Sequence, residues 1–441
     1  MRLTRLTRLA AVLTAAVVLA PAGSAQAALE PGDLDPGFSS DGKAMVDFGR
    51  HTILEQARDV LIGSHGRVLT VGTVFTQTGS SWGLAQLRGN GSPDPSFSGN
   101  GRRTTTFTGH DDATRVLGLS EGRFLVAGSA GGSFALARYA KDGTLDAGFG
   151  GAGKVTTDVT AGVDRIFDLR VEPNGSILTA GTAGDQFAMV RYTQDGSLDP
   201  TFGDGGVVLT TEGFVGTPTT VRMQPDGKLL AAGYADTGPS GEPQYSISRF
   251  TTTGALDATF GAGGRVATGF DLSDEASRAY AILVQPDGRI VVAGNSSEGS
   301  GDYRMFSLAR YLSNGTLDAS FGGANGDSPG RTTSSGAQYY AGVSALTAQP
   351  DGRIVAAGWT NTFDNVGHVV AVVRYAADGL VDRTFSGDGL VPFAFPDTSV
   401  RENRSGDAYG VAVRDGRIVV VGTALALGTP KISFGIARLK N

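Results

Sequence analysis

The segment LDASF at residues 317–321, followed by glycine at 322, belongs to a phrase that occurs seven times in this chain. Most copies read Leu-Asp-x-x-Phe, and consecutive copies lie 52 to 64 residues apart. The copies are LDPGF (34–38), PDPSF (93–97), LDAGF (145–149), LDPTF (198–202), LDATF (256–260), LDASF (317–321) and VDRTF (381–385). Because such a period is typical of solenoids, arrays and propellers, the sequence says much about fold and less about activity.

Four β-type segments accompany each copy. In the fifth repeat, a first strand at 279–284 leads through QPDG (285–288) into RIVVAG (289–294), and FSLARY (306–311) follows. The Asp-Gly pair suits a tight hairpin turn, and the unbroken apolar run of the second strand is typical of a strand covered on both faces. A more polar fourth strand completes the unit, as in KVTTDV at 154–159. Four short antiparallel strands of increasing polarity predict one blade of a β-propeller.

The phase of the repeat predicts how the ring closes. The first phrase, at 34–38, is followed by a fourth-type strand at 43–48, whereas the last segment, 434–439, is of the third type. Seven complete blades therefore require the N-terminal strand to join the C-terminal blade, which covers strand edges. We predict an all-β, seven-bladed propeller with four antiparallel strands per blade. A parallel β-helix is the alternative fold, but tight hairpins do not join the strands of a β-helix.

Composition limits the classes of function. The chain has 441 residues, 67 glycines, no cysteine and a net charge of −6, and none of its segments is a basic cluster, so we expect no nucleic-acid partner. Three arginines, an apolar run at 9–20 and the small-residue site at 25–27 predict a signal peptide over residues 1–27. Residues 28–441 are then expected to form one secreted domain that does not insert into a membrane and is monomeric.

The joint pattern PDG-[KR]-[IL]-[VL]-x-AG, then F-x-[LM]-x-RY, then DG-x-LD-x-x-FG resembles the bacterial delta-sixty repeat family over nearly all of residues 28–441. The resemblance implies exported, propeller-like proteins without established catalytic residues. The first two repeats depart from the pattern: Gln86 replaces the third-strand arginine, Pro93 replaces the leucine of the phrase, and SHG (64–66) and SEG (120–122) replace PDG.

Two residue types recur once per repeat and are expected to be structural. The aspartate of each phrase lies in a turn, where Asp accepts hydrogen bonds from nearby backbone N–H groups. The third-strand arginines are expected to make an ion pair or hydrogen bond between strands, with the repeated Asp as the nearby candidate. The aspartates are Asp35, Asp94, Asp146, Asp199, Asp257, Asp318 and Asp382, and the arginines are Arg138, Arg191, Arg249, Arg310, Arg374 and Arg438.

Acidic residues gather just before the first strands. The innermost strand of a propeller lines the axial channel, so these carboxylates are candidates for one channel mouth, where a cation or sugar hydroxyls could bind. Strand capping and solubility are the competing explanation. The residues are Glu55, Asp111, Asp112, Asp164, Asp274, Glu275 and Asp407.

The connections from second to third strand and from blade to blade are long and variable, and they share one face, which we call the variable-loop face. Loops on a rigid scaffold are the usual place for binding sites. Aromatic residues in these loops suit flat polar ligands such as glycans, or a protein partner, unless they simply pack their own loops. They include Tyr234, Tyr303, Trp359 and Phe363.

The sequence favours a secreted, non-catalytic propeller that binds a glycan or a protein. Its candidate ligand-binding residues are Tyr234, Tyr303, Trp359, Phe363, Asp112, Asp164, Asp274 and Asp407. No catalytic residue, metal ligand or cofactor is predicted, since only four histidines and no cysteine are present and none lies at metal-ligand spacing. The alternative is an exported glycan hydrolase, lyase or quinone-dependent dehydrogenase with its site at the channel mouth.

Overall fold

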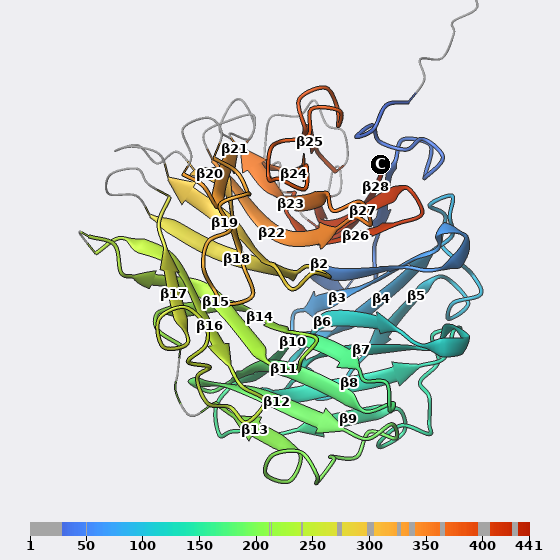
Figure 1. The fold of residues 1–441 in the computed structure, drawn as a ribbon. Coiled ribbons are helices and arrows are strands. Elements are labelled where there is room, and N and C mark those ends of the chain that lie inside the picture. Colours follow the sequence, from blue (N-terminus) through green and yellow to red (C-terminus); the bar gives the residue numbers. More distant parts are fainter. Residues whose placement is uncertain are drawn as a thin grey trace, which may run out of the picture.

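The computed structural model describes residues 29–49, 51–210, 212, 214–239, 241–270, 276–297, 304–323, 328–334, 340–361, 367–395, 406–425 and 431–441. The predicted signal peptide, residues 1–27, lies outside this part of the chain. The described residues form 28 strands that are arranged as blades around a centre (Figure 1). Within each blade the first strand lies nearest the centre and the fourth lies at the outside (Figure 1).

The blades are numbered in chain order. Blade 1 contains β2 (Thr52–Ile62), β3 (Val68–Thr76), β4 (Gly79–Leu87) and β5 (Arg102–Thr105), and blade 2 contains β6 (Asp111–Gly118), β7 (Phe124–Ala130), β8 (Ser133–Tyr139) and β9 (Lys154–Thr157). Blade 3 contains β10 (Asp164–Val171), β11 (Ile177–Ala183), β12 (Gln186–Tyr192) and β13 (Val207–Leu209), and blade 4 contains β14 (Thr217–Met223), β15 (Leu229–Asp236), β16 (Pro243–Phe250) and β17 (Arg265–Thr268). Blade 5 contains β18 (Ser277–Val284), β19 (Ile290–Ser297), β20 (Arg304–Tyr311) and β21 (Arg331–Ser334), and blade 6 contains β22 (Ala341–Ala348), β23 (Ile354–Asn361), β24 (His368–Tyr375) and β25 (Leu390–Phe393). Blade 7 contains β26 (Ala408–Arg414), β27 (Arg417–Leu425), β28 (Ile432–Lys440) and, from the other end of the chain, β1 (Lys43–Val46).

Strand β1 closes the ring as predicted. It pairs antiparallel with β28, from Lys43 opposite Ala437 to Val46 opposite Phe434. In Figure 1 the blue N-terminal segment accordingly lies beside β28. A single parallel bridge between Leu54 and Ile432 joins this blade to blade 1, so the two form one eight-stranded sheet beside five separate four-stranded sheets. The seven-bladed propeller is therefore confirmed, and the β-helix is excluded.

The core lies between the blades. Seven hydrophobic clusters each combine side chains of two neighbouring blades, one cluster for every interface of the ring. The second strands are buried on both faces, as β7 shows with all seven of its residues buried. Third-strand tyrosines reach across the interface, where the hydroxyls of Tyr139 and Tyr192 donate to Thr105 and Thr157 of the preceding blades at 2.9 Å. Burying this apolar surface between sheets supplies most of the stabilisation of the fold.

The repeated arginine and aspartate form an ion pair in six blades, which confirms the structural interpretation. The Arg Nε to Asp Oδ2 distances run from 2.7 to 2.9 Å. Each guanidinium also lies over the phenylalanine of the same phrase, 4.5 to 4.9 Å from the ring centroid. We call this unit of one arginine, one aspartate and one phenylalanine the Arg–Asp–Phe framework.

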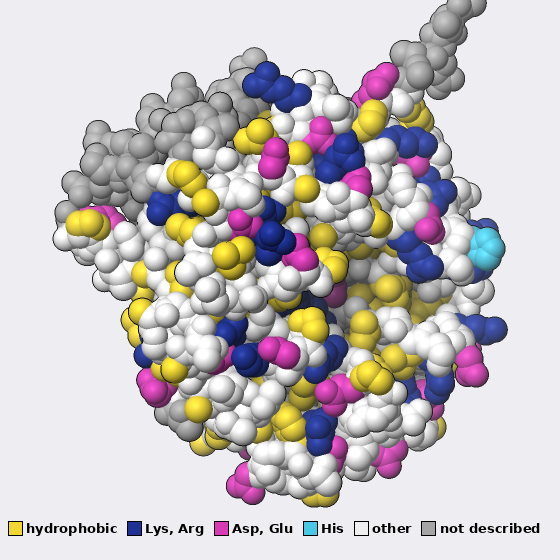
Figure 2. Space-filling model, in the orientation of Figure 1, with side chains coloured by type: hydrophobic (Ala, Val, Ile, Leu, Met, Phe, Trp, Pro, Cys, Tyr) yellow, Lys and Arg dark blue, Asp and Glu magenta, His cyan; other side chains and the backbone are white. Residues whose placement is uncertain are grey.

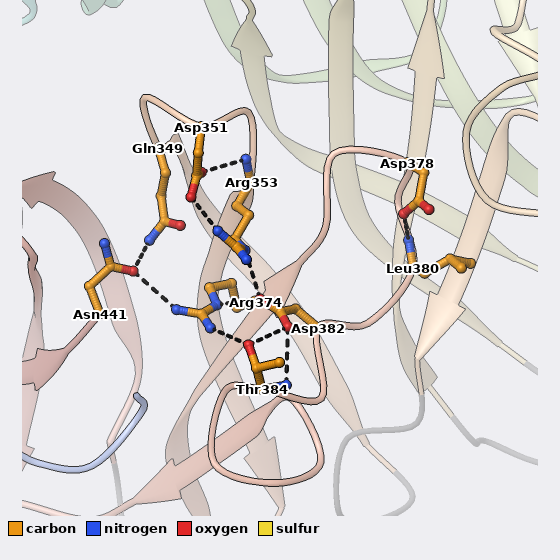
Figure 3. A network of polar contacts seen from close by, with 9 residues as sticks. All are labelled: Gln349, Asp351, Arg353, Arg374, Asp378, Leu380, Asp382, Thr384 and Asn441. Carbon is orange, nitrogen blue, oxygen red and sulfur yellow. Dashed lines mark hydrogen bonds and ion pairs between the residues drawn. The ribbon is translucent and has the colours of Figure 1, made fainter. Parts of the chain in front are cut away.

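Blade 6 shows the polar contacts of the framework (Figure 3). Arg374 Nε donates to Asp382 at 2.8 Å, Arg353 Nε donates to the same carboxylate at 2.9 Å, and Arg374 Nη2 donates to Thr384 Oγ1 at 3.0 Å. The remaining nitrogen, Nη1, bonds Asn441 Oδ1 of blade 7 at 3.1 Å. One buried aspartate thus ties together a turn, two strands of its own blade and, through Arg374, the next blade.

Candidate functional site at the channel mouth

Every first strand carries a β-bulge at the same position. The pairing with the second strand skips one residue in each blade, for example between Ala57 and Asp59 in blade 1. A bulge re-aims the extra side chain, and in this protein all seven extra residues line a cavity of about 270 Å³ on the axis of the ring. These seven residues, the bulge ring, are Arg58, Thr114, Phe167, Thr219, Tyr280, Ser344 and Tyr409.

The glycine at the end of the repeated AG pattern makes the bulge possible. A Cβ atom on Gly72 would lie 1.9 Å from the carbonyl oxygen of Gln56 on the first strand. The equivalent glycine of blade 6, Gly358, would meet the carbonyl oxygen of Gly342 at the same distance. Since no real Cβ approaches an oxygen so closely, only glycine lets the first strand come near enough to form the bulge.

A second ring lies two residues before the bulge, toward the variable-loop face. Its members vary in charge and size from blade to blade and we call them the mouth ring. They are Gln56, Asp112, Arg165, Thr217, Arg278, Gly342 and Asp407. On the second strands, Tyr234 lies opposite Thr217 and Trp359 lies opposite Gly342. Four of the eight predicted ligand-binding residues therefore come together around this mouth: Tyr234, Trp359, Asp112 and Asp407.

Of the other four predicted residues the structure describes only Asp164, which does not form part of the mouth. Asp164 is fully buried and accepts the backbone N–H groups of Val159 and Thr160 at 2.8 and 3.1 Å. Asp111 caps the loop of blade 2 in the same way, which agrees with the capping explanation for these positions. Tyr303, Phe363 and Asp274 lie outside the described residues.

A chain of contacts runs along the mouth from blade 6 through blade 7 to blade 1. The Trp359 indole stacks on His368 with ring centroids 4.2 Å apart and an interplanar angle of 17°. His368 Nδ1 lies 3.3 Å from Asp407, and the Tyr409 hydroxyl donates to the same carboxylate at 3.3 Å. Arg58 then covers the Tyr409 ring at 4.7 Å. His368 remains 44% exposed, so this arc of rings and charges faces solvent.

A second group lies on blades 4 and 5. The Arg278 guanidinium covers the Tyr234 ring at 5.1 Å from its centroid. Tyr280, which belongs to the bulge ring, lies two residues after Arg278, and burial raises the pKa of its hydroxyl. The mouth therefore carries aromatic rings beside charged side chains in two places, on blades 4 and 5 and on blades 6, 7 and 1.

The channel itself carries an excess of positive charge. Four arginines and two aspartates line the cavity, namely Arg58, Arg115, Arg165, Arg222, Asp59 and Asp112. Arg115 Nε donates to the Phe167 carbonyl of the next blade at 2.7 Å, and Arg222 Nη1 donates to Asp168 at 3.0 Å. The side chain of Arg165 is exposed and makes no hydrogen bond or ion pair with the described residues.

Burial shifts the protonation equilibria of two groups in the channel. Burial and the positive charge of Arg222 lower the pKa of Arg115 to about 10, so the two guanidiniums repel each other within the channel. Burial and the negative charge of Asp407 raise the pKa of Tyr409 to about 12, so its hydroxyl stays protonated near neutral pH. The channel thus offers cations and a neutral hydroxyl donor.

Sequence reasoning missed the arginines and tyrosines of the channel. The signal that could have found them is a variable residue at a fixed place in the repeat. The first strands read ARDV (57–60), ATRV (113–116), IFDL (166–169), PTTV (218–221), AYAI (279–282), VSAL (343–346) and AYGV (408–411), and their second letter is the bulge residue. This position is the one that changes chemistry in almost every copy.

The described part of the chain shows no cluster of three His, Asp or Glu side chains that could hold a metal ion. Among those residues no helix is long and apolar enough to cross a membrane.

Six segments of the chain match DUF5122, a β-propeller domain of unknown function. The matched residues are 65–97, 120–149, 172–202, 224–260, 285–321 and 349–385. These repeats are thus similar to the DUF5122 β-propeller domain. The matched segments run from the turn before the second strand to the Leu-Asp-x-x-Phe phrase, so the family is recognised by the framework and not by the channel. No curated protein matches the chain.

Solved structures of similar shape are β-propeller-like at low sequence identity. They include PorZ, a surface component of the type-IX secretion system of Porphyromonas gingivalis (13% identity, TM-score 0.43). The matched region covers 88% of this chain and 46% of PorZ. They also include the polysaccharide lyase Uly1 (10%, TM-score 0.47, covering 90% of this chain and 93% of that one). A third is the β-propeller domain of the Trilobed protease from Pyrococcus furiosus (10%, TM-score 0.41, covering 89% and 96%). The chain thus spans less than half the length of the first of these proteins.

Proposed function

We propose that this protein is an exported, monomeric, non-catalytic propeller that binds an acidic glycan at the channel mouth on its variable-loop face. The observation that supports this most is the grouping of Trp359, His368, Asp407, Tyr409 and Arg58 in one continuous arc. None of these side chains belongs to the repeated framework, so the fold does not require them there.

The aromatic rings suit the flat faces of sugar rings. Trp359 is only half-buried and lies over Gly342, where a larger mouth-ring residue would displace it: a Cβ on Gly342 would lie 3.1 Å from the indole Nε1. Tyr234 holds the equivalent position in blade 4. Rings in such positions offer apolar contact area with a polar edge, and this combination recurs in sites for polar ligands.

The arginines favour an acidic sugar over a neutral one. Guanidinium groups bind carboxylates and sulfates through paired hydrogen bonds, and four of them line the channel, with Arg165 at its mouth and the other three below. An acidic group would also reduce the repulsion between Arg115 and Arg222. A protein partner would instead require a broad surface.

The alternative function, an exported enzyme, rests on Tyr409, Asp407 and His368 beside Arg58. A tyrosine acts as a general base only when it loses its proton at the working pH, and the raised pKa of Tyr409 opposes this. The arc of residues from Trp359 to Arg58 therefore supports binding more than catalysis.

Isothermal titration of the purified protein with tetragalacturonate, beside a neutral oligosaccharide of equal length, tests the proposal. We expect the acidic sugar to bind more tightly. Trp359→Ala should weaken binding at least tenfold, or about 1.4 kcal/mol, and Arg165→Gln should weaken it several-fold and reduce its dependence on salt.

Leu198→Ala provides the control, because this exposed leucine lies in a turn of the opposite face. Its affinity should equal that of the native protein. Acidic sugars that bind with full affinity to Trp359→Ala and Arg165→Gln would disprove the site, and release of unsaturated or shortened products would favour the enzyme. Export is tested separately, by locating the protein in the medium of cells that express the full chain.

A further inference from the structure

Blade 1 lacks the arginine of the Arg–Asp–Phe framework. In blade 2, Arg138 Nη1 crosses to blade 3 and donates to the Gln194 carbonyl at 2.7 Å. Arg249, Arg310 and Arg438 make the same bond to the carbonyls of Ser313, Ala377 and Gly89. Gln86 stands at this position in blade 1, and its Nε2 reaches only Asp94 of its own blade, at 3.1 Å. The arginine link between blades 1 and 2 is therefore missing.

A cavity of about 770 Å³ occupies the place of this link. In blade 5, Arg310 contacts Ser320, two residues after the framework aspartate, and Ala377, the residue before the Asp-Gly turn of the next blade. The residues at the same two places around blade 1 are Ser96 and Lys141, and both line the cavity together with Gln86. The cavity therefore lies where the guanidinium lies in the other blades.

A second departure from the repeat enlarges the space. Gly118 ends β6 opposite Phe124. Blades 3, 4 and 5 carry Val171, Met223 and Val284 at this place. A Cβ on Gly118 would lie 3.1 Å from Leu61 Cδ2, so a larger side chain there would press on the cavity wall. The two 3₁₀ turns η1 (Ser64–Gly66) and η2 (Ser120–Gly122), which replace the usual hairpin turn in these blades, lie at its edge.

The cavity combines an apolar wall with a cationic rim. The apolar side chains are Leu61, Ile62, Leu69, Leu117, Leu119 and Phe124. The charged residues are Arg67, Arg123, Lys141 and Arg414 against Asp142. Figure 2 shows the molecule hollowed on the side where β2, β3, β6 and β7 lie in Figure 1, with hydrophobic side chains inside and Lys or Arg side chains near the edge. Arg123 Nε is buried and has no hydrogen-bond partner, so at least one donor in this rim is unsatisfied.

We propose that the cavity between blades 1 and 2 binds a small organic anion with an apolar body. The apolar wall accommodates the body, and the rim holds the anionic group through charge-assisted hydrogen bonds. The cavity lies at the turns between first and second strands, on the face opposite the channel mouth, so this site is independent of glycan binding.

The fluorescent anion 8-anilinonaphthalene-1-sulfonate tests the site in the full chain. The native protein should bind one equivalent saturably. Gln86→Arg restores the framework arginine and should weaken binding at least tenfold, and Gly118→Val should do the same by filling the space. Lys141→Gln should weaken binding several-fold, whereas Lys154→Gln, an equal change of charge on β9 outside the cavity, should leave it unchanged.

The neutral analogue N-phenyl-1-naphthylamine separates charge from apolar contact and should bind the native protein more weakly than the sulfonate. A melting temperature of Gln86→Arg equal to or above that of the native protein shows that the variant is folded. If this melting temperature falls, the affinity of Gly118→Val for the sulfonate tests the site instead. The proposal is overturned by a native protein without saturable binding, by equal affinity in the folded filled variant, or by tighter binding of the neutral analogue.

Discussion

Two aspartates of this propeller, Asp382 and Asp407, show how the protein divides its residues between fold and site. Asp382 belongs to the framework, where Arg374 and Arg353 contact its buried carboxylate, and its counterparts recur in every blade. Asp407 lies at the channel mouth, is 28% exposed and pairs with His368. The mouth-ring position that it occupies holds a different residue in most blades. Positions that repeat hold the blades together, and positions that vary at a fixed place around the axis are free to bind.

The largest expected effect comes from removing the strand that closes the ring. Deletion of residues 34–48 takes away β1 together with the buried Phe38 and Val46, and it exposes the edge of β28. Because blades 6 and 1 both pack on blade 7, we expect the melting temperature of the whole domain to fall, with increased aggregation. Differential scanning calorimetry measures this. An unchanged melt would show that blade 7 is stable without β1.

The comparison itself is tested by truncating each aspartate in turn. Asp382→Ala leaves the buried guanidinium of Arg374 without its carboxylate and should lower the free energy of unfolding by about 3–5 kcal/mol. Asp407→Ala removes a partly exposed pair and should cost about 1 kcal/mol or less. Urea unfolding of both variants gives the two values. Similar losses in the two variants would contradict the division between framework and mouth.

We expect acid to destabilise the fold by protonating the aspartates of the framework. The pKa of each of the seven repeated aspartates lies below its ordinary value. Burial alone would raise the pKa of Asp318, but hydrogen bonds from Ser320, the positive charge of Arg310 and a hydrogen bond from Arg289 outweigh it and bring the pKa to about 2. The folded state therefore binds fewer protons than the unfolded state.

The stability that Asp318 contributes is then fully present above about pH 5 and is lost progressively as the pH falls through about 2. Asp318→Asn should flatten this dependence, since the amide does not titrate, while also lowering stability at pH 7. Unfolding free energies measured between pH 5 and pH 2 check the slope. A stability that rises on acidification in this range would contradict the assignment.

The fold could be predicted from the sequence because its signals repeat. Seven phrases, turns and apolar strands agree with one another, and the phase of the repeat predicts the closure by residues 43–48. The pairing of Arg with Asp was also within reach, since both recur once per blade at constant spacing. The register of the strands could not be predicted, because a bulge adds one residue without a change in hydrophobic pattern.

The site was only partly predictable for the same reason. The glycine of the AG pattern marks the bulge. The reason that glycine is needed, the carbonyl oxygen of Gln56 or Gly342 where a Cβ would lie, becomes visible only in three dimensions. Trp359 and Tyr234 were found as loop aromatics, whereas Arg58, Tyr280 and Tyr409 looked like ordinary strand residues. Gln86 was visible as a departure from the repeat, but only the neighbouring blade shows that its smaller side chain leaves a cavity.

A crystal structure of the protein with bound tetragalacturonate tests the central claim most directly, that the non-repeated residues around the axis form the binding site. The account predicts a sugar ring against the Trp359 indole and a carboxylate within hydrogen-bonding distance of a channel arginine such as Arg165. A sugar bound with full occupancy elsewhere on the protein, with the mouth left open, would contradict it.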